Sequence, residues 1–145
     1  MLKIMSWLVA VVIALQFIPF GKNHTNPPVL AEPNWDSETT KQLFNRACAD
    51  CHANTTKYPW YSNVAPISWL IANHIEEGRE HFNVSAWGVQ KKNKGDEAAE
   101  EVEEGKMPIF GYDWTHPEAR LTLDEKKQLI QGLKATFGEE EEEDE

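Results

Sequence analysis

Both cysteines of this chain lie in one five-residue stretch, CADCH at residues 48–52, together with one of its five histidines. A Cys-x-x-Cys pair is used by zinc sites, by redox dithiols and by sites that attach haem. A structural zinc site needs four ligands, and His74, His81 and His116 do not form the second close-spaced pair that is expected. A thioredoxin-like dithiol opens a helix after a strand in a βαβ unit, which the sequence does not show. Zinc, a dithiol and a plain disulfide are therefore poorer matches than haem.

The histidine directly after the second cysteine favours haem attachment. In this chemistry Cys48 and Cys51 each form a thioether with a haem vinyl group, and His52 is carried to the iron as its proximal ligand. Covalent attachment prevents loss of the cofactor outside the cytoplasm, and it lets a small domain use the porphyrin as part of its core. The sequence therefore predicts one haem c per chain, with its iron, held by these three residues.

The other axial position of the iron needs a further ligand. Met1 and Met5 fall in the apolar N-terminal stretch, which leaves Met107 for the soluble part of the chain. Met107 follows Gly105, a predicted helix cap, and precedes Pro108, so its loop can turn a side chain inward. We predict Met107 as the distal metal ligand. Methionine also fills irregular gaps in a core, and packing beside the haem is the alternative role.

Other polar residues are weaker candidates. His74 falls on the apolar face of a predicted helix, where core packing is the commoner role, yet it is the best replacement for Met107. His81 and His116 stand in polar, irregular surroundings and are predicted to be solvated. Arg79 and Arg120 are candidates to pair with haem propionates, because guanidinium binds carboxylate in a two-pronged geometry. Surface ion pairing is the commoner role for both arginines.

Flat side chains gather near the motif, in YPWYS at residues 58–62 and at Trp69 and Trp87. Such side chains line a porphyrin or simply fill a core. The sequence leaves these two roles open.

Apolar residues at helical spacing predict the elements that must position the site. Ser37 is a good N-cap for a helix that leads directly into the cysteines, and Thr122 with Glu125 forms a capping-box pattern. No pattern typical of a βαβ unit or a β-hairpin competes with this helical interpretation. The predicted class is mostly α, a single small domain over residues 36–138, with helices after Ser37, over 66–78, over 96–105 and over 122–138.

The N-terminal stretch at residues 4–20 carries no charge, and only Ser6 and Gln16 interrupt its apolar run. As a helix it would extend about 25 Å, near the lower limit for crossing a bilayer and long for a signal peptide. A cleavage site after Ala31 would lie unusually far from the apolar run, so we favour an uncleaved anchor at residues 1–20 over a cleaved leader. Lys3 then marks the cytoplasmic side, which predicts an extracytoplasmic domain.

Two further segments complete the predicted organisation. Residues 21–35 are rich in proline and asparagine and predict an extended tether. The formal net charge of −10 owes much to the run of seven acidic residues at 139–145. Such a run repels itself and predicts a disordered, solubilising tail, and the acidic balance makes nucleic acid an improbable partner.

The chain resembles a known family, the small bacterial haem-binding domain proteins with a c-type attachment motif, which are related to the c-type cytochromes. The resemblance rests on NPPV in the tether, on CADCHANTTKYPWYSNVAPISWLIANHIEEGREHFNVSAW, and on MPIFGYDWTHPEARLTLDE before the last helix. It implies a cytochrome c-like helical fold, haem on Cys48 and Cys51, His52 as proximal ligand and Met107 as distal ligand. Because the family is bacterial, the anchor predicted above would lie in the bacterial cytoplasmic membrane, with the soluble domain facing the periplasm.

These observations together predict a membrane-tethered, extracytoplasmic monohaem c-type cytochrome that transfers single electrons between redox partner proteins. No catalytic residue is predicted, and an electron carrier is favoured over an enzyme. One alternative is a haem peroxidase-like enzyme, in which His74 or His81 serves acid-base chemistry beside an open iron. A second alternative is a haem-based gas or redox sensor, although no output domain accompanies it.

Overall fold

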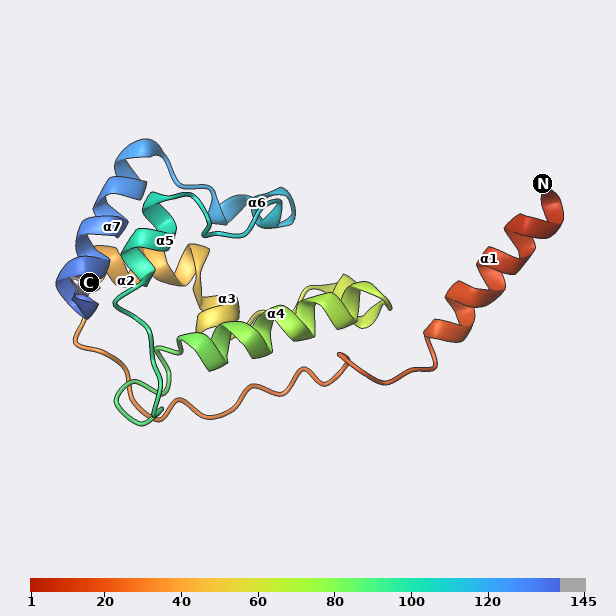
Figure 1. The fold of residues 1–145 in the computed structure, drawn as a ribbon, viewed down its shortest axis with the longest axis horizontal. Coiled ribbons are helices and arrows are strands. Elements are labelled where there is room, and N and C mark those ends of the chain that lie inside the picture. Colours follow the sequence, from red (N-terminus) through yellow and green to blue (C-terminus); the bar gives the residue numbers. More distant parts are fainter. Residues whose placement is uncertain (139–145) are drawn as a thin grey trace, which may run out of the picture.

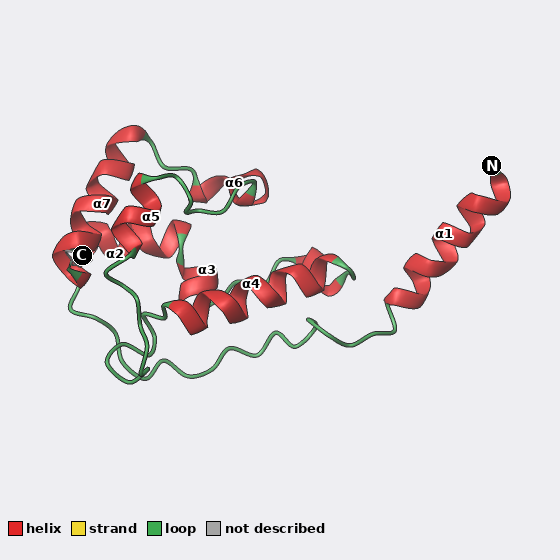
Figure 2. Ribbon diagram, viewed as in Figure 1, coloured by secondary structure: helices red, strands yellow, loops and turns green. Residues whose placement is uncertain are grey.

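The computed structural model describes residues 1–138, so the acidic run predicted as a tail lies outside the described residues. The described chain is mostly helical with no β-strand, which confirms the predicted class, and its one isolated bridge joins Ala31 and Ala86. Figure 2 shows the helices joined by long loops. In chain order the elements are α1 (Leu2–Leu15), α2 (Glu38–Ala47), α3 (Ala49–His52), the 3-10 turn η1 (Trp60–Asn63), α4 (Ile67–His81), α5 (Ala98–Glu103), α6 (Tyr112–Thr115), the 3-10 turn η2 (Pro117–Ala119) and α7 (Leu123–Phe137).

The helices that follow α1 pack in two groups (Figure 1). Helix α7 contacts both α2 and α5, and the short α3 lies on α4. The first group encloses a core of apolar side chains with at most 5% of their surface exposed, which includes Leu43, Phe44, Val102, Leu129 and Leu133. Because α3 follows α2 almost directly, the CADCH motif lies where the two groups meet.

The helix predicted to lead into the cysteines is present, but it is broken at the first of them. Ser37 caps it, with its Oγ accepting a hydrogen bond from the Thr40 amide at 3.2 Å. α2 ends at Ala47, Cys48 has φ −127° and ψ −31°, and α3 begins at Ala49. The change of direction at Cys48 turns the motif out of the α2 axis toward α4.

The other predicted helices are present with shifted ends. α4 continues to His81, so Gly78 lies inside it and does not end it. α5 is shorter than predicted, with Gly105 just beyond its end at φ +76°, a conformation that glycine adopts without strain. The predicted capping box of α7 is confirmed, since Glu125 N–H donates to Thr122 Oγ1 and Thr122 N–H donates to a Glu125 carboxylate oxygen.

The N-terminal helix is shorter than the apolar stretch that predicted it. α1 ends at Leu15, because a proline at position 19 has no N–H and its ring clashes with the carbonyl four residues earlier. Residues 17 and 18 instead make tighter bonds to the carbonyls three residues back. Among residues 1–138, no helix has both the length and the apolar character needed to cross a membrane.

The segment predicted as a tether runs along the domain (Figure 1). Leu30 N–H donates to Ser85 O at 2.8 Å, and Asn26 Nδ2 donates to Thr56 O at 2.9 Å. The ring of His24 stacks on Tyr58 with their centroids 4.3 Å apart. Residues 21–35 are therefore extended, as their prolines indicate, but they are bound to the domain surface.

Helices α2 and α7 lie close together at Gly132, which is buried. A Cβ atom placed on Gly132 would overlap the Thr40 side chain. A larger residue would therefore separate α2 from α7, which contribute Leu43, Phe44, Leu129 and Leu133 to the core.

We expect Gly132→Ala to lower the free energy of unfolding by about 1–3 kcal/mol, because overpacking outweighs the roughly 1 kcal/mol that alanine gains over glycine in a helix. Thermal unfolding followed by far-UV circular dichroism measures the effect. Gln131→Ala, at the exposed neighbouring position, is the matched control and should change stability little. A higher unfolding temperature for Gly132→Ala would contradict this description of the α2–α7 contact.

Candidate functional site

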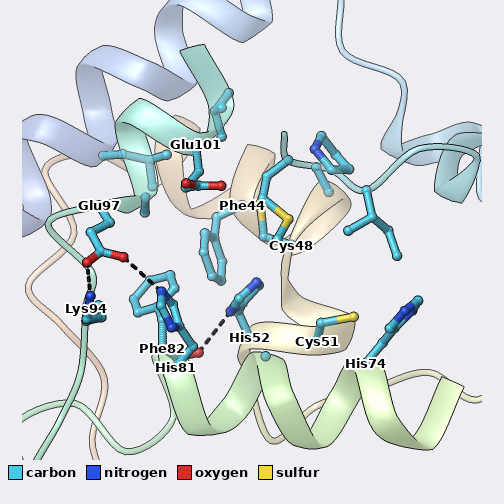
Figure 3. Close-up of a pocket in the computed structure, with 18 of the residues that line it drawn as sticks. Phe44, Cys48, Cys51, His52, His74, His81, Phe82, Lys94, Glu97 and Glu101 are labelled. Carbon is cyan, nitrogen blue, oxygen red and sulfur yellow. Dashed lines mark hydrogen bonds and ion pairs between the residues drawn. The ribbon is translucent and has the colours of Figure 1, made fainter. Parts of the chain in front are cut away.

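A cavity with a volume of about 420 Å³, within the range of cofactor sites, opens beside the CADCH motif. It lies between α2, α3, α4 and α5, and the loop after α5 forms another part of its wall (Figure 3). Its apolar wall comprises Phe44, Ala47, Phe82, Ala98, Val102, Met107, Pro108, Ile109 and Leu133, and charged side chains occur at Glu77, Lys94, Glu97 and Glu101.

The three residues of the attachment motif all line this cavity. Burial raises the pKa of Cys48 to about 12, and burial together with the neighbouring Asp50 carboxylate raises the pKa of Cys51 to about 11. Both side chains are therefore neutral thiols near pH 7. Figure 3 shows Cys51 and His52 on the same short helix, with Cys48 at its start.

The imidazole of His52 is held in one orientation. Its Nδ1–H donates to the carbonyl oxygen of Phe82 at 3.0 Å, which leaves the lone pair on Nε2. Burial lowers the pKa of His52, with the backbone bond partly opposing this effect, so the neutral form is favoured. A neutral imidazole with an oriented, unprotonated nitrogen is the form that binds a metal.

Helix α4 supports the motif from below in the view of Figure 3. A Cβ atom at Gly78 would lie 2.7 Å from Cys51 O and 3.0 Å from Cys51 Cβ. The absence of a side chain at Gly78 therefore allows α3 to lie directly on the α4 backbone. This close approach is the reason for a glycine inside a helix, where it is otherwise unfavourable.

Helix α6, which follows the loop after α5, is joined to the motif by a partly buried hydrogen bond that the sequence did not reveal. Tyr112 lines the cavity, and its hydroxyl donates to Asp50 Oδ2 at 2.7 Å. Burial and this bond raise the pKa of Tyr112 well above its usual range. The ring of His116, predicted to be solvated, stacks on Tyr112 at a centroid distance of 4.1 Å, and only 15% of its side chain is exposed. Asp50 of the CADCH motif thus holds Tyr112, on the opposite wall of the cavity, in place.

Met107 and His74 both line the cavity, as do the motif residues. Met107 is half-buried against the core, and its amide donates to Glu101 O at 2.9 Å, which turns the chain back after α5. His81, predicted to be solvated, also lines the cavity, with about half of its side chain exposed and Nε2 2.9 Å from Glu97 Oε2. The structure therefore brings Met107 and both α4 histidines to one site.

The two arginines considered for propionate pairing do not line the cavity. Arg79 donates to Ala53 O, Asn26 Oδ1 and Thr56 Oγ1, and so joins α4 to the loops after α3 and α1. Arg120 pairs with Asp113 at 3.3 Å on the surface. The cationic group that does border the cavity is Lys94, which pairs with Glu97.

The aromatic residues singled out in the sequence lie elsewhere. Residues 58–62, Trp69 and Trp87 do not line the cavity. Trp87 packs on Phe82 and Phe137 in the core, so of its two predicted roles it has the core-filling one. The rings that do border the cavity are those of Phe44, Phe82 and Tyr112.

The chemistry of the site fits a haem. The wall is mainly apolar, as a porphyrin requires, and the side chains that line it include two thiols, an oriented imidazole and a thioether. Cys48, Cys51 and His52 would hold the cofactor, and Met107 or His74 could supply a further ligand to its iron. The cation of Lys94 is at the rim, where propionate carboxylates would meet solvent.

Comparison with known proteins agrees with this chemistry. A family model described as a haem-binding domain matches residues 10–135, most of the chain. Searches of curated proteins and of solved structures gave no match.

We expect Gly78→Ala to displace α3 from α4 and to lower both the unfolding temperature and the amount of haem bound per chain. The new methyl group would meet the Cys51 backbone, which cannot move aside as a flexible side chain does; the cost is about 1–3 kcal/mol. Haem content, measured from the ratio of haem to protein absorbance, and thermal unfolding report the two effects. Asn73→Ala, at an exposed position of α4, is the control; equal haem content in both variants would contradict the proposed contact.

Proposed function

Because the chain belongs to the haem-binding domain family, we propose that it is a monohaem c-type cytochrome that transfers single electrons. One observation carries the proposal: both cysteines, His52 and Met107 line a single, mainly apolar cavity. Bound haem supplies an iron that cycles between the ferrous and ferric states. In this proposal the domain is a small cytochrome c-like helical fold built around that cofactor.

We propose covalent attachment through Cys48 and Cys51. Each thiol adds across a vinyl group: a sulfur–carbon bond forms, the thiol hydrogen goes to the neighbouring vinyl carbon, and no oxidant is consumed. The position of the two thiols supports this attachment. Cys48 directly precedes α3, Cys51 lies within it, and both line the same cavity. His52, next in the chain, presents Nε2 because Nδ1 is bonded to Phe82 O.

We propose Met107 as the distal ligand. The thioether is a soft, neutral ligand that favours ferrous iron, so a His–Met pair gives a higher reduction potential than two histidines. The link from Tyr112 to Asp50 supports this assignment, because it fixes the loop that carries Met107 against the attachment helix. His74 is the replacement if Met107 only packs in the core.

A peroxidase-like enzyme is the second candidate, and one observation favours it. His81 and Glu97 form a 2.9 Å pair on the cavity wall, an arrangement suited to moving protons beside an open iron. This function requires that Met107 leave the distal position free. Loss of the Met107 side chain therefore distinguishes the two candidates.

We also propose that residues 1–20 attach the protein to the bacterial cytoplasmic membrane, with the domain on the periplasmic side and redox proteins as partners. Residues 2–14 of α1 are all exposed, and nearly all are apolar. The Ser6 hydroxyl donates to Leu2 O within the helix, so it needs no water partner. A helix that is apolar on every face and covered by no other described element favours a lipid environment.

We expect the haem of the natively matured protein to resist extraction with acidified acetone, and the double variant Cys48→Ala/Cys51→Ala to release it. Each single variant should keep one thioether and therefore its haem. The measurement is the haem absorbance that remains with the precipitated protein. Complete extraction from the unmodified chain would refute covalent attachment while leaving haem binding itself possible.

We expect Met107→Ala to abolish the weak near-infrared sulfur-to-iron band of the ferric protein, to lower the reduction potential and to open the iron to cyanide or carbon monoxide. Met5→Ala, in the exposed α1, is the matched control and should leave all three unchanged. An unchanged spectrum and potential in Met107→Ala would instead favour His74 as the ligand or an open site.

A further inference from the structure

The end of α1 is fixed to the domain by the side chain of Gln16. Gln16 Nε2 donates to Ala65 O at 2.9 Å, and Ala65 N–H donates to Gln16 Oε1 at 3.0 Å. The two bonds pair one side-chain amide with one backbone residue. In Figure 1 the end of α1 correspondingly points at the η1–α4 junction.

The chain just after α1 makes a second contact with the same place. Gly21, at φ +73°, lies so close to the first turn of α4 that a Cβ atom there would overlap the backbone carbonyl of Ser68. Asn26 and His24, further along, are bonded or stacked to the domain as well. The apolar helix is therefore not separated from the domain by a free linker.

Exposed apolar side chains surround this attachment point on the domain. Ala65 lies between Val64 and Pro66, and beside them Trp60 is 79%, Ile67 45% and Leu70 56% exposed. Phe17, Ile18 and Phe20, which end the apolar N-terminal stretch, are exposed too. We name the four domain residues Trp60, Val64, Ile67 and Leu70 the η1–α4 patch.

We propose that the η1–α4 patch lies in the surface of the lipid bilayer and fixes the orientation of the domain on the membrane. The inference rests on the proposed membrane attachment through residues 1–20. The patch is continuous with the apolar end of that segment, so lipid that surrounds Phe17 to Phe20 also meets the patch. Tryptophan at its edge is the residue type enriched at the membrane–water interface.

The orientation has a consequence for the haem cavity. Ile67 and Leu70 precede His74 on one face of α4, and His74 lines the cavity. His74 is seven positions after Ile67, which corresponds to about 10 Å along α4. The bound patch therefore holds the haem cavity close to the membrane surface, on the side from which a membrane-embedded redox protein would exchange electrons.

Site-specific photocrosslinking in phosphatidylcholine vesicles tests the proposal on the full, haem-loaded chain. p-Benzoylphenylalanine is placed at position 60 or 67, or at position 89 as the matched control. Val89 is apolar and 59% exposed, and the adjacent Gln90 bonds to Arg79 O and Glu80 O at the opposite end of α4. Lipid adducts are quantified by mass spectrometry after irradiation.

We expect a several-fold higher yield of lipid adduct at positions 60 and 67 than at position 89. If the chain sediments with the vesicles but all three positions give similar yields, the fixed orientation is wrong and the membrane attachment stands. If the chain does not sediment with vesicles, the proposed attachment itself fails, and the inference with it. The three results are distinguishable because sedimentation and adduct yield are measured on the same sample.

Discussion

The site depends on the contact between Gly78 and Cys51. The four-residue α3 is too short to be stable alone, so its position comes from what it lies on. The missing side chain at Gly78 lets the α3 backbone approach α4 directly. That approach brings His52 within hydrogen-bond reach of Phe82 O, just past the end of α4, and so selects the imidazole nitrogen that faces the cavity.

A second constraint acts from the other side of the cavity. Asp50 lies between the two cysteines of the motif and accepts a hydrogen bond from Tyr112, five residues after Met107. The same Asp50 carboxylate accepts a hydrogen bond from the Lys57 amide at 2.9 Å, so it joins the loop after α3 to α6. Helix α3 is thereby linked both to α4 and to the segment that follows Met107.

The local features of this protein could be predicted from sequence, and the long-range ones could not. CADCH, the Ser37 cap and the Thr122–Glu125 capping box are decided within a few residues, and their helices are where the patterns place them. The hydrogen bond between Asp50 and Tyr112 joins residues 62 positions apart, and that between Gln16 and Ala65 joins residues 49 positions apart. No local sequence pattern predicts either bond. Gly78 was predicted to end a helix, but it lies inside α4 and allows close packing with α3. The sequence alone does not distinguish these two roles of a glycine.

The central claim is that the two thiols on α3 hold one haem beside His52. Tryptic digestion after Arg46 and Lys57 isolates the peptide of residues 47–57, which contains all three motif residues. In natively matured protein, mass spectrometry of this peptide should show one haem with both cysteines resistant to thiol alkylation. A peptide of unmodified mass with both cysteines alkylated, or joined as a disulfide, would contradict the claim.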